Sequence, residues 1–224
     1  GGAHQSIGTP LVGMAQDGLT YFEPAYADEL TVVLEWAMSH LQAPRGGSVY
    51  LRLSTRAVEQ PQRELDMPAQ LDVLRGAYWR APPHEDTELA IVYCGAVAPE
   101  ASAAHTALLE DLPAVALLAV TSPDLLYQDW CRSRRARAEH IPTDASHVET
   151  LLAALPRGAG IVTVLDGHPA TLAWLGGVHG HRVSALGVTN FGQSADLPDL
   201  LQLHRIDADG VLDAAAALLL QNRG

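Results

Sequence analysis

Residues 89–120 read LAIVYCGAVAPEASAAHTALLEDLPAVALLAV. The run 89–93 is apolar and rich in β-formers, and it ends at Cys94-Gly95, which predicts a buried strand. A helix is predicted over 99–109, and a second apolar strand over 115–120. Strand, helix and strand in this order predict parallel strands joined by a right-handed crossover.

The same alternation continues toward the end of the chain. It predicts that residues 75–224 form an open, mostly parallel α/β sheet flanked by helices. Further strands are predicted over 76–80 (an edge strand), 161–165 and 183–188. Further helices are predicted over 125–137, from the capping pair Ser146 and Glu149 to 155, over 170–175, and from Asp207 to about 220.

A second α/β unit is predicted at the start of the chain. A helix is predicted over 24–43, with Pro24 suited to its first position, and the strand SVYLRL follows at 48–53. Residues 1–56 are therefore assigned to the end of one α/β domain, and the polar, proline-containing stretch 57–74 to a linker. The helix carries one apolar stripe, made of Leu30, Val33, Leu34, Ala37, Met38 and Leu41.

Composition excludes several classes of function. The formal net charge of −12 repels nucleic acid and anionic membrane surfaces. No apolar run reaches the roughly 18 residues that span a bilayer. The two cysteines, Cys94 and Cys131, have no spacing typical of a metal site, so no metal ligand is predicted, and their small number suits a reducing cytoplasm.

The first ten residues, GGAHQSIGTP, have the composition of a ligand-binding loop. Gly1-Gly2 permits positive φ and close approach of the backbone to a ligand, and His4 is of the residue type that most often exchanges protons in active sites. A lone loop histidine is more often structural or solvated than catalytic. His4 is nevertheless the main candidate, and Gln5 and Ser6 are weaker ones.

Three further segments follow predicted strands, where open α/β sheets bind ligands. They are Cys94-Gly95-Ala96, Asp166-Gly167-His168, and the run 190–194 (NFGQS). Ordinary turn chemistry is the favoured interpretation of each of them, and a ligand-binding role is the alternative. The basic group at 132–137, with four arginines, is interpreted as a solvated helix face, and docking of an acidic partner is the alternative.

Two long runs resemble a known enzyme group. Residues 1–30 (GGAHQSIGTPLVGMAQDGLTYFEPAYADEL) and 46–55 (GGSVYLRLST) resemble the late pyrimidine-binding domain of thiamine-diphosphate enzymes. The nearest resemblance is to the homodimeric pyruvate dehydrogenase decarboxylating component, a 2-oxo acid dehydrogenase of the transketolase superfamily. Residues 185–219 resemble that family's C-terminal domain, in which a strand, a turn and two helices close the chain.

The resemblance implies an activity, a set of substrate-facing residues and a location for the cofactor-binding motifs. It implies oxidative decarboxylation of pyruvate or a related 2-oxo acid, with acyl transfer to the lipoyl group of a partner acyltransferase, by a cytoplasmic homodimer. His4 matches a family histidine that faces the substrate, with Gln5 and Ser6 beside it. Thiamine diphosphate and Mg²⁺ are held by upstream motifs that this sequence lacks. The chain is therefore expected to be a C-terminal fragment that is inert and does not bind the cofactor alone.

Two alternatives remain open at this point. A transketolase-like enzyme acting on sugar phosphates would use basic residues as a phosphate clamp, for which Arg52 and Arg56 are candidates. A non-catalytic regulatory or assembly domain of the same ancestry is the other.

Overall fold

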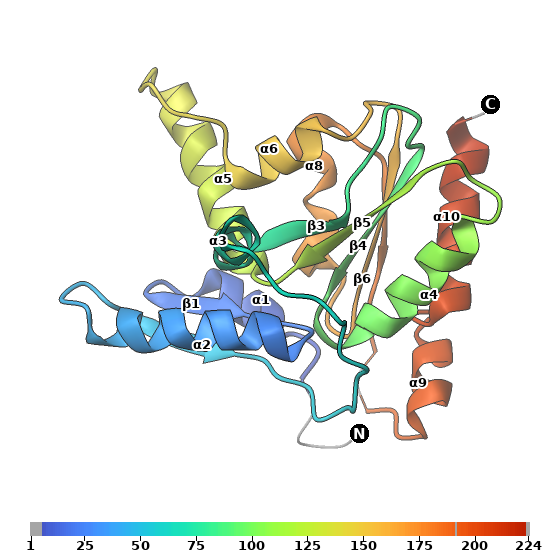
Figure 1. The fold of residues 1–224 in the computed structure, drawn as a ribbon, viewed down its shortest axis with the longest axis horizontal. Coiled ribbons are helices and arrows are strands. Elements are labelled where there is room, and N and C mark those ends of the chain that lie inside the picture. The colour runs from blue at the N-terminus through green and yellow to red at the C-terminus, as the bar shows by residue number, and fades with distance from the viewer. Residues whose placement is uncertain (1–5, 191, 223–224) are drawn as a thin grey trace.

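The computed structural model describes residues 6–190 and 192–222, which form two sheets with helices packed around them (Figure 1). The larger sheet has five strands in the order β3-β5-β4-β6-β7. Strand β4 pairs in parallel with both β5 and β6, and only β3 is antiparallel. The strands are β3 (Ala77–Ala81), β4 (Leu89–Cys94), β5 (Val115–Val120), β6 (Gly160–Leu165) and β7 (Val183–Leu186). The predicted mostly parallel α/β sheet is confirmed.

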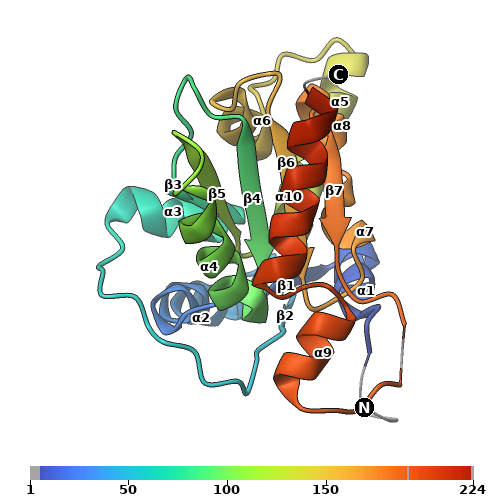
Figure 2. The same ribbon diagram turned by 90° about the vertical axis from the view of Figure 1, so that its right-hand side faces the viewer.

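Helices cover both faces of this sheet, because alternate side chains of the central strands enter two separate cores. Ile91 and Tyr93 pack toward α4 and α10, whereas Ala90 and Val92 pack toward α5 and α6. Figure 2 shows α4 and α10 crossing the near face of the sheet. The helices of the first face are α4 (Ala98–Leu108) and α10 (Ala208–Asn222). Those of the second face are α5 (Pro123–Ala138), α6 (His147–Ala153), α7 (Ala170–Ala173) and α8 (Gly176–His179).

The smaller sheet contains β1 (Leu19–Phe22) and β2 (Ser48–Leu51), paired in parallel and joined through α2 (Ala27–Gln42). It is attached to the larger sheet at the point where β5 ends. The Tyr21 amide donates to the Asp124 carboxylate at 3.1 Å, and the Glu23 amide donates to the Thr121 carbonyl at 2.7 Å. The outer edge of β1 is thus capped by groups at the start of α5.

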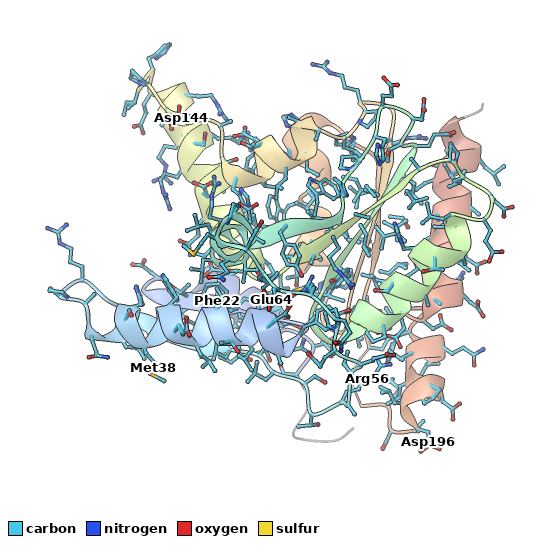
Figure 3. The ribbon with its side chains drawn as sticks, in the orientation of Figure 1. Phe22, Met38, Arg56, Glu64, Asp144 and Asp196 are labelled. Carbon is cyan, nitrogen blue, oxygen red and sulfur yellow. The ribbon has the colours of Figure 1, made fainter. Side chains whose placement is uncertain are left out.

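The apolar stripe of α2 is divided in the structure. Val33 and Ala37 are buried, whereas Leu34, Met38 and Leu41 are 37%, 58% and 54% exposed. Figure 3 shows Met38 directed away from the body of the molecule. The expected single stripe is therefore only half buried, because the two-stranded sheet covers a narrow part of the helix surface.

Several short elements were absent from the sequence prediction. They are α1 (Thr9–Ala15), β1, α3 (Met67–Arg75) and α8. Helix α3 lies within the segment predicted as a linker, and residues 52–66 before it have neither helix nor strand. The two closing helices that the resemblance implied are α9 (Leu197–Leu203) and α10. None of the described helices is long and apolar enough to cross a membrane.

Two buried histidines give the fold a predicted sensitivity to acid. His147 is 3% exposed, and its Nε2 donates to the Ala77 carbonyl at 2.8 Å. Burial lowers the pKa of His147 and also that of His181. Because the unfolded chain binds these protons more readily, stability is expected to fall as pH drops below about 6.5, by at most about 1.4 kcal/mol per pH unit for each histidine.

Urea unfolding between pH 5 and 7.5 would measure this slope. The double variant His147→Gln/His181→Gln should show a shallower slope over the same range. An equal slope in the variant would mean that other groups cause the acid sensitivity.

Candidate functional site at the carboxyl ends of the strands

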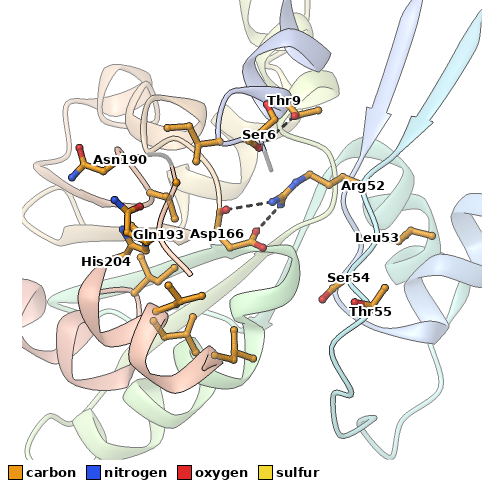
Figure 4. Close-up of a pocket in the computed structure, with 17 residues that line it drawn as sticks. Ser6, Thr9, Arg52, Leu53, Ser54, Thr55, Asp166, Asn190, Gln193 and His204 are labelled. Atoms are coloured by element: carbon orange, nitrogen blue, oxygen red, sulfur yellow. Dashed lines mark hydrogen bonds and ion pairs between the residues drawn. The ribbon is translucent and has the colours of Figure 1, made fainter. Parts of the chain in front are cut away.

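A cleft of about 580 Å³ lies at the edge where the strands of both sheets end. Figure 4 shows its two sides, with Ser54 and Thr55 on one and Asn190, Gln193 and His204 on the other. Helix α9 contributes an apolar wall, made of Leu197, Leu200 and Leu201. The volume is within the range of small-molecule sites, which is about 300–1,000 Å³.

The parallel arrangement brings four strand ends together here. Glu23 follows β1, Arg52 follows β2, Gly95 follows β4 and Asp166 follows β6. Successive parallel strands all end at the same edge, so residues far apart in sequence become neighbours. The carboxyl ends of the smaller sheet face those of the larger one at this point.

Arg52 is the centre of this arrangement. Its Nη1 donates to a Glu23 carboxylate oxygen and, at 2.6 Å, to Asp166 Oδ1, while its Nη2 donates to the Asp166 carbonyl at 3.3 Å. The side chains of Arg52, Glu23 and Asp166 are 22%, 2% and 33% exposed. Burial lowers the pKa of Arg52, but the two carboxylates outweigh it and raise that pKa above its ordinary value. Arg52 is therefore a permanent cation that joins the two sheets.

Glu23 is an unusually buried carboxyl group. Its second oxygen accepts a hydrogen bond from the Tyr21 hydroxyl. Burial raises the pKa of Glu23 to about 8, although Arg52 acts in the opposite direction. Gly95 makes room for it, because Gly95 has φ of +66° and a Cβ there would overlap the Glu23 carboxylate.

Arg56, the second basic residue considered as a phosphate clamp, is also paired. Its two Nη atoms donate to the two Glu100 oxygens at 2.8 and 2.7 Å, and Nη1 donates to the Ala96 carbonyl at 3.1 Å. This bidentate geometry satisfies the guanidinium. Arg52 and Arg56 are therefore both paired with carboxylates.

The described lining of the cleft offers few ionisable groups. Besides Arg52, these are Asp166 and His204. The remaining polar groups are hydroxyls and amides, from Ser6, Thr9, Ser54, Thr55, Asn190 and Gln193. The cleft can accept and donate hydrogen bonds to a polar ligand and hold an apolar group against α9.

Ser6 is the one predicted site residue that lies within the described residues. His4 and Gln5 lie outside the described residues. Ser6 lines the cleft, is exposed, and its carbonyl accepts a bond from Thr9 Oγ1 at 3.4 Å. His4 thus precedes a cleft residue by two positions in the sequence.

The three segments noted after predicted strands all reach this edge. Gly95 adjoins Glu23, Asp166 binds Arg52, and Asn190, Gly192 and Gln193 line the cleft, while Phe191 lies outside the described residues. Glu23 and His204 were not predicted. An isolated acidic residue at the end of a short strand carries no local sign that it is buried.

The basic group lies in the second half of α5, which leads to the loop bearing Asp144 (Figure 3). Arg137 pairs with Glu149, Arg132 lies 3.7 Å from Asp129, and Arg134 stacks over Trp130 at 4.8 Å. These contacts agree with a solvated helix face. The cysteines are both free.

The residues present do not fit a metal–diphosphate site. Within 6–190 and 192–222, no three His, Cys, Asp or Glu side chains are grouped to hold a metal ion. The cleft arginine is already paired with carboxylates, so it does not offer a diphosphate its charge.

Comparison with solved structures places this architecture among the α/β folds with a mostly parallel sheet. Several transketolases are among the matching structures. That of Leishmania mexicana is 21% identical with a TM-score of 0.71, and that of Pichia stipitis in complex with sedoheptulose-7-phosphate is 19% identical with a TM-score of 0.70. Each match covers 99% of this chain and 28% of the transketolase.

A split-gene transketolase, described as an inactive β4 tetramer, is 19% identical with a TM-score of 0.66, over 98% of this chain and 63% of its own. No family model and no curated protein sequence matches the chain. The chain therefore has the fold of part of a transketolase, and spans little more than a quarter of the length of most of those compared.

Proposed function

We propose that this chain is the C-terminal part of a thiamine-diphosphate-dependent 2-oxo acid dehydrogenase acting on pyruvate or a close homologue. The acyl group would pass to the lipoyl group of a partner acyltransferase. The observation that carries the proposal is that Ser6, in the segment resembling the family's substrate-facing loop, lines the cleft of a chain with a transketolase-like fold.

His4 is the residue assigned to the substrate. Its proposed role is hydrogen bonding and proton transfer around the 2-oxo acid, for which an imidazole with a pKa near neutrality is suited. Gln5 and Ser6 would support it from the same segment. Thiamine diphosphate and Mg²⁺ would supply the decarboxylation chemistry and would be held by residues outside this chain.

The pairing of both candidate clamp arginines supports a substrate without a phosphate group. A sugar phosphate needs a cation that is free to bind it, whereas Arg52 and Arg56 already hold carboxylates. A transketolase-like transferase is the second candidate, since solved structures that share the fold include transketolases, one of them in complex with sedoheptulose-7-phosphate.

The proposed assembly is a cytoplasmic homodimer. The oligomer reported for the split-gene transketolase supports self-association of proteins with this fold. Its description as inactive also supports the third possibility, a non-catalytic assembly or regulatory domain.

Turnover by the complete enzyme tests these functions against one another. We expect the enzyme, loaded with thiamine diphosphate and Mg²⁺, to acylate a lipoyl domain with pyruvate and related 2-oxo acids, and His4→Ala to lower kcat/KM by about 10²-fold or more. His84→Ala is the matched control, because His84 lies near the opposite end of the strands, and it should leave kcat/KM unchanged.

Each other result contradicts the proposal in a different way. Faster turnover of ketose phosphates would favour the transketolase-like transferase. Turnover of neither substrate class would favour the non-catalytic domain. Full activity of His4→Ala would remove His4 from the site.

A further inference from the structure

One nitrogen atom of Arg52 donates hydrogen bonds to two carboxyl groups that follow strands of different sheets. Nη1 contacts both Glu23, at the end of β1, and Asp166, at the end of β6. Nη2 also binds the Asp166 carbonyl, so that the main chain and the side chain of Asp166 are both fixed. Asp166 is the only carboxylate among the described residues that line the cleft.

We propose that Arg52 is a positioning residue for Asp166, and that a single proton on Glu23 controls how tightly Arg52 joins the two sheets. The proposal concerns the cleft itself and does not depend on which reaction the protein catalyses. The proton on Glu23 would thereby affect Arg52 and Asp166, which both line the cleft.

The charge balance of the three side chains favours a proton on Glu23. When Glu23 carries a proton, one carboxylate and one guanidinium remain, and the group is neutral. When Glu23 ionises, two carboxylates compete for one guanidinium in a place with little solvent. Glu23 rather than Asp166 holds the proton, since Glu23 is 2% exposed and Asp166 is 33% exposed.

The surroundings of Glu23 cannot compensate a negative charge on its carboxyl group. Gly95 leaves no space for a further group, because even a Cβ there would overlap Glu23. The titratable groups that face Glu23 are Tyr21 from β1, Tyr50 from β2, Arg52 after β2, Cys94 at the end of β4 and Asp166 after β6. Burial raises the pKa of Tyr50 and of Cys94, so both stay uncharged at neutral pH. Arg52 is thus the cation among these groups that balances the charge of Glu23.

The direction of the pH effect follows from linkage. In the closed arrangement the pKa of Glu23 is about 8, and on opening it returns to the ordinary value of 4.5. The open form therefore binds fewer protons between these values. Separation of the two sheets becomes easier as pH rises toward 8, by up to about tenfold per pH unit, and levels off above it.

Amide hydrogen exchange, measured by mass spectrometry between pH 6.5 and 9, tests this. Exchange in β1 and β2 is compared with that in β4 and β5 and corrected for intrinsic rates. In the wild-type chain, the opening equilibrium of β1–β2 should rise by about 15-fold between pH 6.5 and 8, by about 30-fold at pH 9, and then level off. Glu23→Gln, which cannot ionise, should remove this rise.

Two further variants separate positioning from simple structural support. Asp166→Asn leaves Glu23 as the sole carboxylate partner of Arg52, so the rise should level off at a lower pH. Glu100→Gln weakens the Arg56 pair, also an arginine–carboxylate contact, and should keep the wild-type profile. The proposal is overturned if Glu23→Gln keeps the wild-type profile, or if Asp166→Asn leaves the levelling pH unchanged.

Discussion

Replacing Arg52 with Met is expected to lower the free energy of unfolding by about 1–3 kcal/mol at pH 7, because the buried, protonated Glu23 and the Asp166 carboxylate lose the donor that they share. Glu23 accounts for most of this loss, since its side chain is 2% exposed and Arg52 is its cationic partner in the described structure. Asp166 loses less, because water reaches it. The loss should grow as pH rises toward 8, where more of Glu23 ionises.

Urea denaturation at pH 7 and 8 would measure the loss. Arg52→Met/Glu23→Gln should recover a large part of it, because the double variant need not take up a proton to bury the side chain at position 23. Arg75→Met is a matched control, since the Arg75–Asp72 pair is exposed and its atoms are 3.8 Å apart, and it should change stability by less than about 0.5 kcal/mol. A loss below 1 kcal/mol in Arg52→Met would show that the contact contributes little.

Replacing Glu29 with Ala is expected to cost about 3 kcal/mol, because several buried donors would lose their acceptor. Glu29 is fully buried in α2 and accepts bonds from the Tyr78 hydroxyl, from the Ala25 amide at 2.7 Å and from Arg63 at 3.3 Å. It therefore joins α2 both to strand β3 and to the segment 52–66.

Unfolding and limited proteolysis together test this prediction. Glu29→Ala should lower the unfolding midpoint in urea and make residues 57–66 more sensitive to protease, since Arg63 loses one of its anchors. Glu35→Ala, on the exposed face of the same helix, should change neither. Unchanged cleavage of 57–66 in Glu29→Ala would mean that Asp28, which also binds Arg63, is the main anchor.

The sheet could be predicted because its strands are long, apolar and separated by distinct turns. Strand β5 matches its predicted bounds, and β4 extends one residue beyond its prediction. The fully buried central strands give a continuous apolar signal, which is typical of parallel sheets covered on both faces. Short elements such as β1 and α1 carry few periodic residues, and their formation depends on the contacts of Tyr21 with α5.

The candidate site, like the fold, could be predicted from the sequence only in part. The turns at Gly95, Asp166 and Asn190 were recognisable because they follow predicted strands. The burial of Glu23 was not, because its neighbours come from β2, β4 and β6. For Arg52 the sequence indicated a possible phosphate clamp, and its carboxylate partners changed that interpretation.

The sequence by itself determined the alternation of strands and helices, and with it the mostly parallel sheet, because periodicity and turn residues act over a few neighbouring positions. It also supplied His4 as a candidate, which remains a prediction. Only the tertiary structure decided which charges meet. Glu23, Arg52 and Asp166 are separated by 29 and 114 positions, and their pairing depends on two sheets that end at a common edge. Burial and charge compensation are properties of that assembled edge, and no local stretch of sequence encodes them.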